Sequence, residues 1–120
     1  MGTRAIRGAT HLAANDKAEM FDAVQELLRA MYERNGLTHD DLISVLFTAT
    51  PDLTAAFPAA AGRELGMGDI PLICAQEIDV PGAMPRVVRV LMHIESDKPR
   101  GEISHVYQRG AEALRQDLAQ

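Results

Sequence analysis

The segment that most constrains the fold is 86–94, which reads Arg-Val-Val-Arg-Val-Leu-Met-His-Ile. Its many β-branched and apolar residues are typical of a strand. Alternate residues of a strand share a face. One face therefore takes Val88, Val90, Met92 and Ile94, and the other takes Val87, Arg89, Leu91 and His93. Because both faces are largely apolar, we expect this strand to be covered on both sides.

Arg89 interrupts that apolar pattern in the middle of the strand. A guanidinium is costly to bury without a partner, because the charge loses its hydration. This stretch alone leaves three interpretations open: a fixed ion pair with a carboxylate of the protein, a solvated face, or a site for an anionic ligand.

Length and composition narrow the class of protein. The 120 residues fit one domain, spanning 1–120. The net charge of −5 argues against nucleic acid as a partner, since a basic surface is its usual footprint. No apolar run approaches the roughly 18 residues of a membrane span, and we expect no membrane association. A single cysteine, Cys74, and no signal-like segment at the N-terminus favour a cytoplasmic protein.

The remaining pattern predicts an α+β fold, a mixed β-sheet with two main helices. Strands are expected over 3–9, 43–49, 71–78 and 103–107, in addition to 86–94. A long helix capped by Asn15 runs to Gly36, and a second one, over 59–65, follows Pro58 and stops at Gly66. Short helical turns are expected after Thr38 and over 110–114. Two helices can cover one face of the sheet. We therefore expect other copies of the chain to cover the second face.

The chemistry that the sequence offers is limited. The four histidines are scattered and show no zinc-ligand spacing with Cys74. There is no phosphate-binding glycine loop and no serine in a nucleophile elbow. What remains is Arg7, Glu77 and Arg89, each in an otherwise apolar strand, with Arg63 and Arg115 near sheet edges. Guanidiniums bind carboxylates in a bidentate manner, and a glutamate accepts from a hydroxyl, so this set suits a small ligand with carboxylates and a hydroxyl. An internal Glu77–Arg89 pair is compatible with such a site.

Short motifs distributed over nearly the whole chain carry a resemblance. They are Ile6-Arg7-Gly8-Ala9-Thr10, Ala49-Thr50-Pro51-Asp52-Leu53, Phe57-Pro58-Ala59, Arg63-Glu64-Leu65, Cys74-Ala75-Gln76-Glu77, Arg89-Val90, His105-Val106-Tyr107 and Leu114-Arg115. In this order and spacing they resemble the AroH-type chorismate mutases. The resemblance implies a homotrimer with a pseudo-α/β-barrel core and three active sites at subunit interfaces. It also implies the pericyclic (Claisen) rearrangement of chorismate to prephenate, on the route to phenylalanine and tyrosine, which needs no metal or cofactor.

The resemblance also implies roles for individual residues. Arg89 would face the ether oxygen and one carboxylate, Arg7 and Tyr107 would bind a carboxylate, and Glu77 would accept the substrate hydroxyl and orient Arg89. Cys74, with the adjoining Ala75 and Gln76, would lie beside the ring. Apolar walls would come from Phe57, Ala59, Ile73 and Leu114. Arg63 and Arg115 would make the mouth positive, and the C-terminal segment could act as a lid. Phe57 and Leu114 could equally be core residues, and Arg115 a solvated charge.

Two departures and two alternatives remain. Ala60 stands where a related enzyme has lysine, and little chain follows Arg115 to close over a ligand. An enamine/imine deaminase of the Rid type also uses an arginine for a substrate carboxylate, although no water-activating arrangement is evident in this sequence. A sensor of aromatic amino acids or chorismate is the second alternative.

Overall fold

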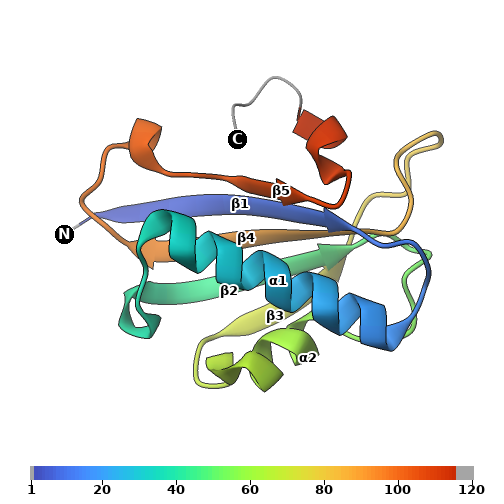
Figure 1. The fold of residues 1–120 in the computed structure, drawn as a ribbon, viewed down its shortest axis with the longest axis horizontal. Helices are drawn as coiled ribbons and strands as arrows, with labels where there is room; N and C mark the ends of the chain where they lie inside the picture. The colour runs from blue at the N-terminus through green and yellow to red at the C-terminus, as the bar shows by residue number, and fades with distance from the viewer. Residues whose placement is uncertain (1, 116–120) are drawn as a thin grey trace.

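The computed structural model describes residues 2–115 and shows a five-stranded sheet in the order β3-β2-β4-β1-β5 (Figure 1). The strands are β1 (Thr3–His11), β2 (Leu42–Ala49), β3 (Leu72–Gln76), β4 (Val87–Glu95) and β5 (Val106–Gln108). The helices are α1 (Lys17–Asn35) and the shorter α2 (Pro58–Gly62). Further helical turns are η1 (His39–Asp41), η2 (Arg63–Met67), η3 (Arg100–Glu102) and η4 (Ala111–Arg115). The mixed α+β architecture expected from the sequence is thereby confirmed.

Strand β4 is the centre of the sheet. It pairs antiparallel with β1 on one side and with β2 on the other, while the edge strands β5 and β3 run parallel to β1 and β2. The predicted alternation along β4 is observed: Val88, Val90, Met92 and Ile94 are buried, and Arg89, Leu91 and His93 on the opposite face are half-buried. Each fully buried aliphatic side chain contributes about 1.5–3 kcal/mol, so the first face anchors the core.

Both main helices lie on the same face of the sheet (Figure 1). The buried stripe of α1 includes Met20, Val24, Leu27, Leu28 and Met31, which join the core residues of β4. The molecule is 21 Å thick along its shortest axis, which fits two layers and no more. We call the uncovered side of the sheet the open face. No helix within residues 2–115 is long and apolar enough to cross a membrane.

The start of α1 corrects one expectation. Asp16, not Asn15, caps the helix, with its carboxylate accepting from the Glu19 N–H at 2.8 Å. The Asn15 side chain instead accepts from the N–H groups of Thr54 and Ala55, so it holds the loop before α2. At the other end, Gly36 adopts the left-handed conformation predicted for it, with φ 61°.

The edge strands are shorter than the sequence pattern predicts. Strand β3 ends at Gln76 because its partner β2 ends at Ala49, whose carbonyl accepts the last bond from Glu77 N–H at 2.9 Å. Strand β5 begins at Val106 because the side chain of Asn35 hydrogen-bonds both backbone groups of Ser104. Asn35 Oδ1 accepts from the Ser104 N–H at 2.8 Å, and Asn35 Nδ2 donates to the Ser104 carbonyl at 2.9 Å. A side chain thus replaces the ladder that residues 103–105 were expected to form.

The helix expected over 59–65 begins at Pro58 and changes at Arg63 into the wider turn of η2. Gly66, inside η2, interrupts the helical dihedral angles with φ 101°, a conformation that favours glycine. The capping box predicted around Thr38 is present at η1, where Asp41 accepts from the Thr38 N–H at 2.8 Å.

The Thr50-Pro51-Asp52 turn controls how the chain enters β4. Asp52 accepts from the Arg86 N–H at 3.0 Å, and Thr50 Oγ1 accepts from the Val87 N–H at 3.0 Å. Thr50 also donates to Asp52 at 2.6 Å, and this hydrogen bond is the main cause that holds the Asp52 pKa below its usual value. These bonds stabilise Arg86 at φ 54°, a conformation uncommon outside glycine. The turn therefore sets the start of the strand that carries Arg89.

Candidate active site

The open face carries a cavity of about 180 Å³, which we call the arginine cavity. Its walls come from β1, β2, β4, β5 and η4, and from Glu77, the residue that follows β3. The lining residues are Arg7, Gly8, Ala9, Leu46, Thr48, Glu77, Arg89, Val90, Leu91, Tyr107 and Arg115. Arg7, Glu77, Arg89, Tyr107 and Arg115 were predicted as site residues, and the fold brings these five together.

Arg89 is paired with Glu77, as the sequence indicated. The Arg89 Nε lies 3.3 Å from Glu77 Oε2, although it lacks the geometry of a hydrogen bond. The two side chains are 42% and 25% exposed, and pairs open to solvent in this way contribute about 0–1 kcal/mol to stability. The pair therefore matters for the orientation of Arg89 more than for folding.

Arg7 lies on β1, two residues from Ala9, which is the cross-strand partner of Arg89. Its Nε is buried and has no hydrogen-bond partner among the described residues. Its backbone N–H donates to His105 Nδ1 at 2.9 Å. Burial lowers the His105 pKa, and the charges of Arg7 and Arg115 lower it further. His105 therefore stays neutral more readily, mainly because it is buried and secondly because Arg7 and Arg115 are positively charged, and its Nδ1 remains available as an acceptor.

Tyr107 closes one side of the arginine cavity. It pairs with Ala9 across the β1–β5 ladder and packs with Ala111, with Leu114 against them. Leu114 is thus half-buried in this small cluster, and Arg115 lines the cavity at the end of η4. The predicted C-terminal lid falls on residues 116–120, outside the described residues.

Six lining residues were not predicted as site residues from the sequence: Gly8, Ala9, Leu46, Thr48, Val90 and Leu91. Thr48 Oγ1 donates a hydrogen bond to Glu77 Oε2. Strand alternation in β2 would place Leu46 and Thr48 on one face, but the pairing register that sets them beside Arg89 and Leu91 is not visible in a single sequence.

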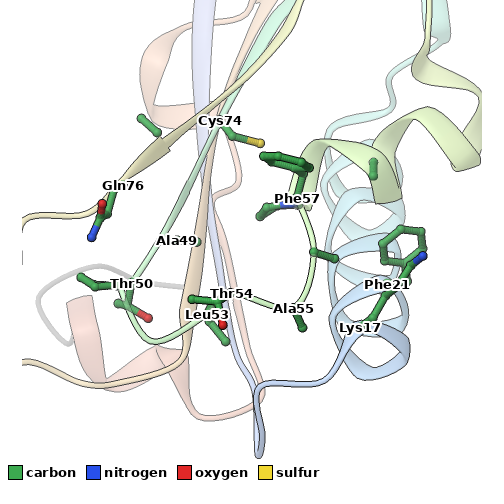
Figure 2. Close-up of a pocket in the computed structure, with 15 residues that line it drawn as sticks. Lys17, Phe21, Ala49, Thr50, Leu53, Thr54, Ala55, Phe57, Cys74 and Gln76 are labelled. Carbon is green, nitrogen blue, oxygen red and sulfur yellow. The ribbon is translucent and has the colours of Figure 1, made fainter.

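A second cavity, of about 630 Å³, lies away from the first, between β3, the loop 50–57 and α1 (Figure 2). We call it the Phe57 cavity. Phe57 is 71% exposed at its rim, and Cys74 directs its sulfur toward this side. Cys74 Sγ accepts from the Ala59 N–H at 3.4 Å, at the start of α2. Ala75, Gln76 and Ala60 also line it, and Lys17 is its only charged lining residue in the described chain.

The predicted site residues are therefore divided between two places. Of the other predicted apolar walls, Ala59 is buried in the core and Ile73 is 64% exposed on edge strand β3. Arg63 is exposed on η2. The fold of one chain does not bring Phe57, Arg63 or Ile73 into the arginine cavity. Among residues 2–115 no group of three or more His, Cys, Asp or Glu is placed to hold a metal ion.

This architecture is that of solved chorismate mutases. A chorismate mutase structure from Clostridium thermocellum superimposes with a TM-score of 0.89, at 49% identity, covering 91% of this chain and 97% of that one. Curated relatives named chorismate mutase AroH are 46% identical in Thermus thermophilus, over 96% of this chain and 95% of the relative, and 40% identical in Bacillus subtilis, over 99% and 94%.

The model of the chorismate mutase type I family matches residues 3–118. The chain belongs to this family and is an enzyme of the isomerase class. The resemblance indicated by the sequence motifs is thereby confirmed.

Proposed function

We propose that the arginine cavity rearranges chorismate to prephenate, with Arg89 as the residue that stabilises the transition state. The observation that carries this proposal is Arg89 itself, a guanidinium held on the open face by Glu77, beside a second arginine whose Nε lacks a partner in the described chain. Two arginines and one carboxylate match a ligand with two carboxylates and a hydroxyl.

The reaction is unimolecular, so the protein has to supply shape and charge. The ether C–O bond of chorismate breaks ahead of C–C bond formation, and negative charge grows on the ether oxygen. A fixed cation at that oxygen stabilises the transition state more than the ground state. Arg89 has this role in our proposal. The rest of the rate acceleration comes from holding the flexible enolpyruvyl group in a chair-like conformation.

The other residues bind and orient the substrate. Arg7 and Tyr107 bind the carboxylate of the enolpyruvyl group, and Arg115 adds positive potential at the mouth. Glu77 accepts the ring hydroxyl and fixes Arg89. This leaves no step that needs a nucleophile, a metal or a cofactor.

We propose further that the active enzyme is a homotrimer, in which the Phe57 cavity of one subunit completes the arginine cavity of the next. The open face and the edge strand β3 support this assembly. Ile73 on β3 and Ile78 and Val80 in the loop after it are 64%, 84% and 54% exposed, and Phe57 is 71% exposed, which is more apolar surface than a monomer normally leaves in water. In the trimer Phe57, Ile73 and Cys74 supply the apolar walls, and Arg63 adds charge at the rim, whereas Ala59 is a core residue. A free Cys74 suits the reducing cytoplasm.

The experiment that tests the function is an assay of chorismate consumption by its absorbance. The native protein converts chorismate to prephenate, and Arg89→Ala reduces turnover on the order of 10² to 10³ or more, the effect of removing an oxyanion donor. Arg89→Lys is also poor, because an ammonium does not replace a planar fork. Near-native turnover by Arg89→Ala refutes the role given to Arg89, and binding without turnover by the native protein supports a sensor instead.

A further inference from the structure

The charges that line the arginine cavity are unequal in number. Glu77 is the only acidic residue among the described lining residues, whereas Arg7, Arg89 and Arg115 are all present. Arg7 lies diagonally across the β1–β4 ladder from Arg89, because Ala9 is the residue directly opposite Arg89. Diagonal positions are about 7–8 Å apart, which long side chains can bridge. Glu77 follows β3, which β2 and β4 separate from β1, so Arg89 and not Arg7 is the guanidinium that Glu77 contacts.

Thr48 is placed to fix the position of the Glu77 carboxylate. Its hydroxyl donates to Glu77 Oε2, and this same oxygen lies 3.3 Å from Arg89 Nε. Thr48 is the β2 residue directly opposite Arg89. A β-branched threonine has few χ1 rotamers, so the direction of its hydroxyl is restricted by the strand. No hydrogen bond within residues 2–115 uses the other oxygen, Oε1.

We propose that Thr48 is a positioning residue that keeps the Glu77 carboxylate on Arg89. Its hydroxyl holds Oε2 beside Arg89 and leaves Oε1 for the hydroxyl of the substrate. This inference rests on the function proposed above, in which Glu77 orients Arg89 and accepts the substrate hydroxyl. Thr48 holds Glu77 in the position that this role requires.

The first test is Thr48→Val, which keeps the shape and branching of threonine but has no hydroxyl. Glu77 then loses the bond that holds its carboxylate, so KM rises because Oε1 is no longer held for the substrate hydroxyl, and kcat falls because Arg89 is less fixed. We expect kcat/KM to fall about 10-fold or more, as when a hydrogen bond to a charged group is lost. Thr48→Ser, which restores the hydroxyl, returns kcat/KM to within about threefold of native. A purely structural defect would lower the active fraction and hence kcat, with KM unchanged.

The second test measures whether Thr48 acts through Glu77. In a Glu77→Ala background, Thr48→Val has little further effect on kcat/KM, because the group that it positions is gone. Effects that multiply independently in the double variant overturn the proposal. If Thr48→Val does not fold, Thr48→Ala compared with Thr48→Ser makes the same distinction.

Ser44→Ala is the matched control. Ser44 lies on the same face of β2, and its hydroxyl is near His93 Nδ1 at 3.4 Å, outside the arginine cavity. Its removal leaves KM and kcat unchanged. Native protein without activity on chorismate refutes the proposed function, whereas active native protein with an equally active Thr48→Val variant refutes only this inference.

Discussion

Cys74 is the single cysteine, and its surroundings favour a structural role over a nucleophilic one. Its sulfur accepts the Ala59 N–H at the start of α2 and is half-buried beside Phe57. Serine can accept the same hydrogen bond with an oxygen. We therefore expect Cys74→Ser to keep most of the native turnover in the chorismate assay. A complete loss of turnover in a folded Cys74→Ser variant would contradict this and indicate covalent chemistry.

His105 gives the fold a pH dependence with a definite sign. Burial and the charges of Arg7 and Arg115 lower its pKa below 6.5, so the unfolded chain binds a proton that the folded chain resists. The contribution of His105 to stability is complete above 6.5 and decreases as the pH falls toward the lower pKa of the folded state. Protonation would also remove the acceptor of the Arg7 N–H.

His105→Asn tests this dependence, because the Asn Oδ1 can accept in place of Nδ1 without titrating. Free energies of unfolding from urea titrations, compared between native protein and variant from about pH 7 to about pH 5, should diverge, with the native protein losing more. Other titrating groups are common to both proteins and cancel in the difference. Parallel losses would show that His105 is not responsible.

At the scale of the elements, Gly8 determines how closely β1 approaches α1. A Cβ at this position would lie 2.6 Å from Met31 Sδ and 3.3 Å from Leu27 Cδ1, both in fully buried side chains. Gly8→Ala therefore overpacks the core, at a cost of about 1–3 kcal/mol. Because Arg7 and Ala9 flank Gly8, a displaced β1 also moves the arginine cavity, and activity decreases with stability.

Gly68→Ala is the control for this prediction. Gly68 has helical dihedral angles, φ −66° and ψ −20°, and a Cβ added there would meet no atom within 4 Å. We expect the free energy of unfolding of the Gly68→Ala variant to stay within about 0.5 kcal/mol of that of the native protein. Equal stability of the two variants in thermal or urea unfolding would mean that α1 can move away from β1 without cost.

The elements also show how much the sequence could predict. Local patterns were sufficient for β4, for the buried stripe of α1 and for the Gly36 cap, because periodicity and capping act over a few residues, although the N-cap of α1 is Asp16 and not Asn15. They failed at β5, where Asn35 binds Ser104 from 69 positions away. The sequence pointed to Arg7, Glu77 and Arg89 because a charged side chain in an apolar strand is costly to bury unless it has a partner or a ligand. It did not point to Thr48, because the role of Thr48 depends on a register between β2, β3 and β4 that only the folded sheet defines.

At the scale of the whole molecule, the separation of the two cavities leads to a sharp test of the proposed trimer. Arg89 and Glu77 lie in the arginine cavity, and Phe57 lies at the rim of the other. If each active site combines the two halves from different subunits, an Arg89→Ala subunit still offers an intact Phe57 half. A Phe57→Asp subunit still offers an intact arginine half, and Phe57 is exposed enough for this change not to disturb folding.

Mixed trimers of these two variants should therefore regain activity that neither has alone. Random assembly places native halves together in about a quarter of the sites, so we expect about a quarter of the native turnover after joint refolding or co-expression. Mixing Arg89→Ala with Glu77→Ala is the control, because both damage the same half and no subunit then offers an intact arginine cavity. Sedimentation checks that the variants and mixtures remain trimeric. Recovery only in the first mixture requires a site shared between subunits, whereas the absence of recovery in a verified mixed trimer places the whole site within one chain.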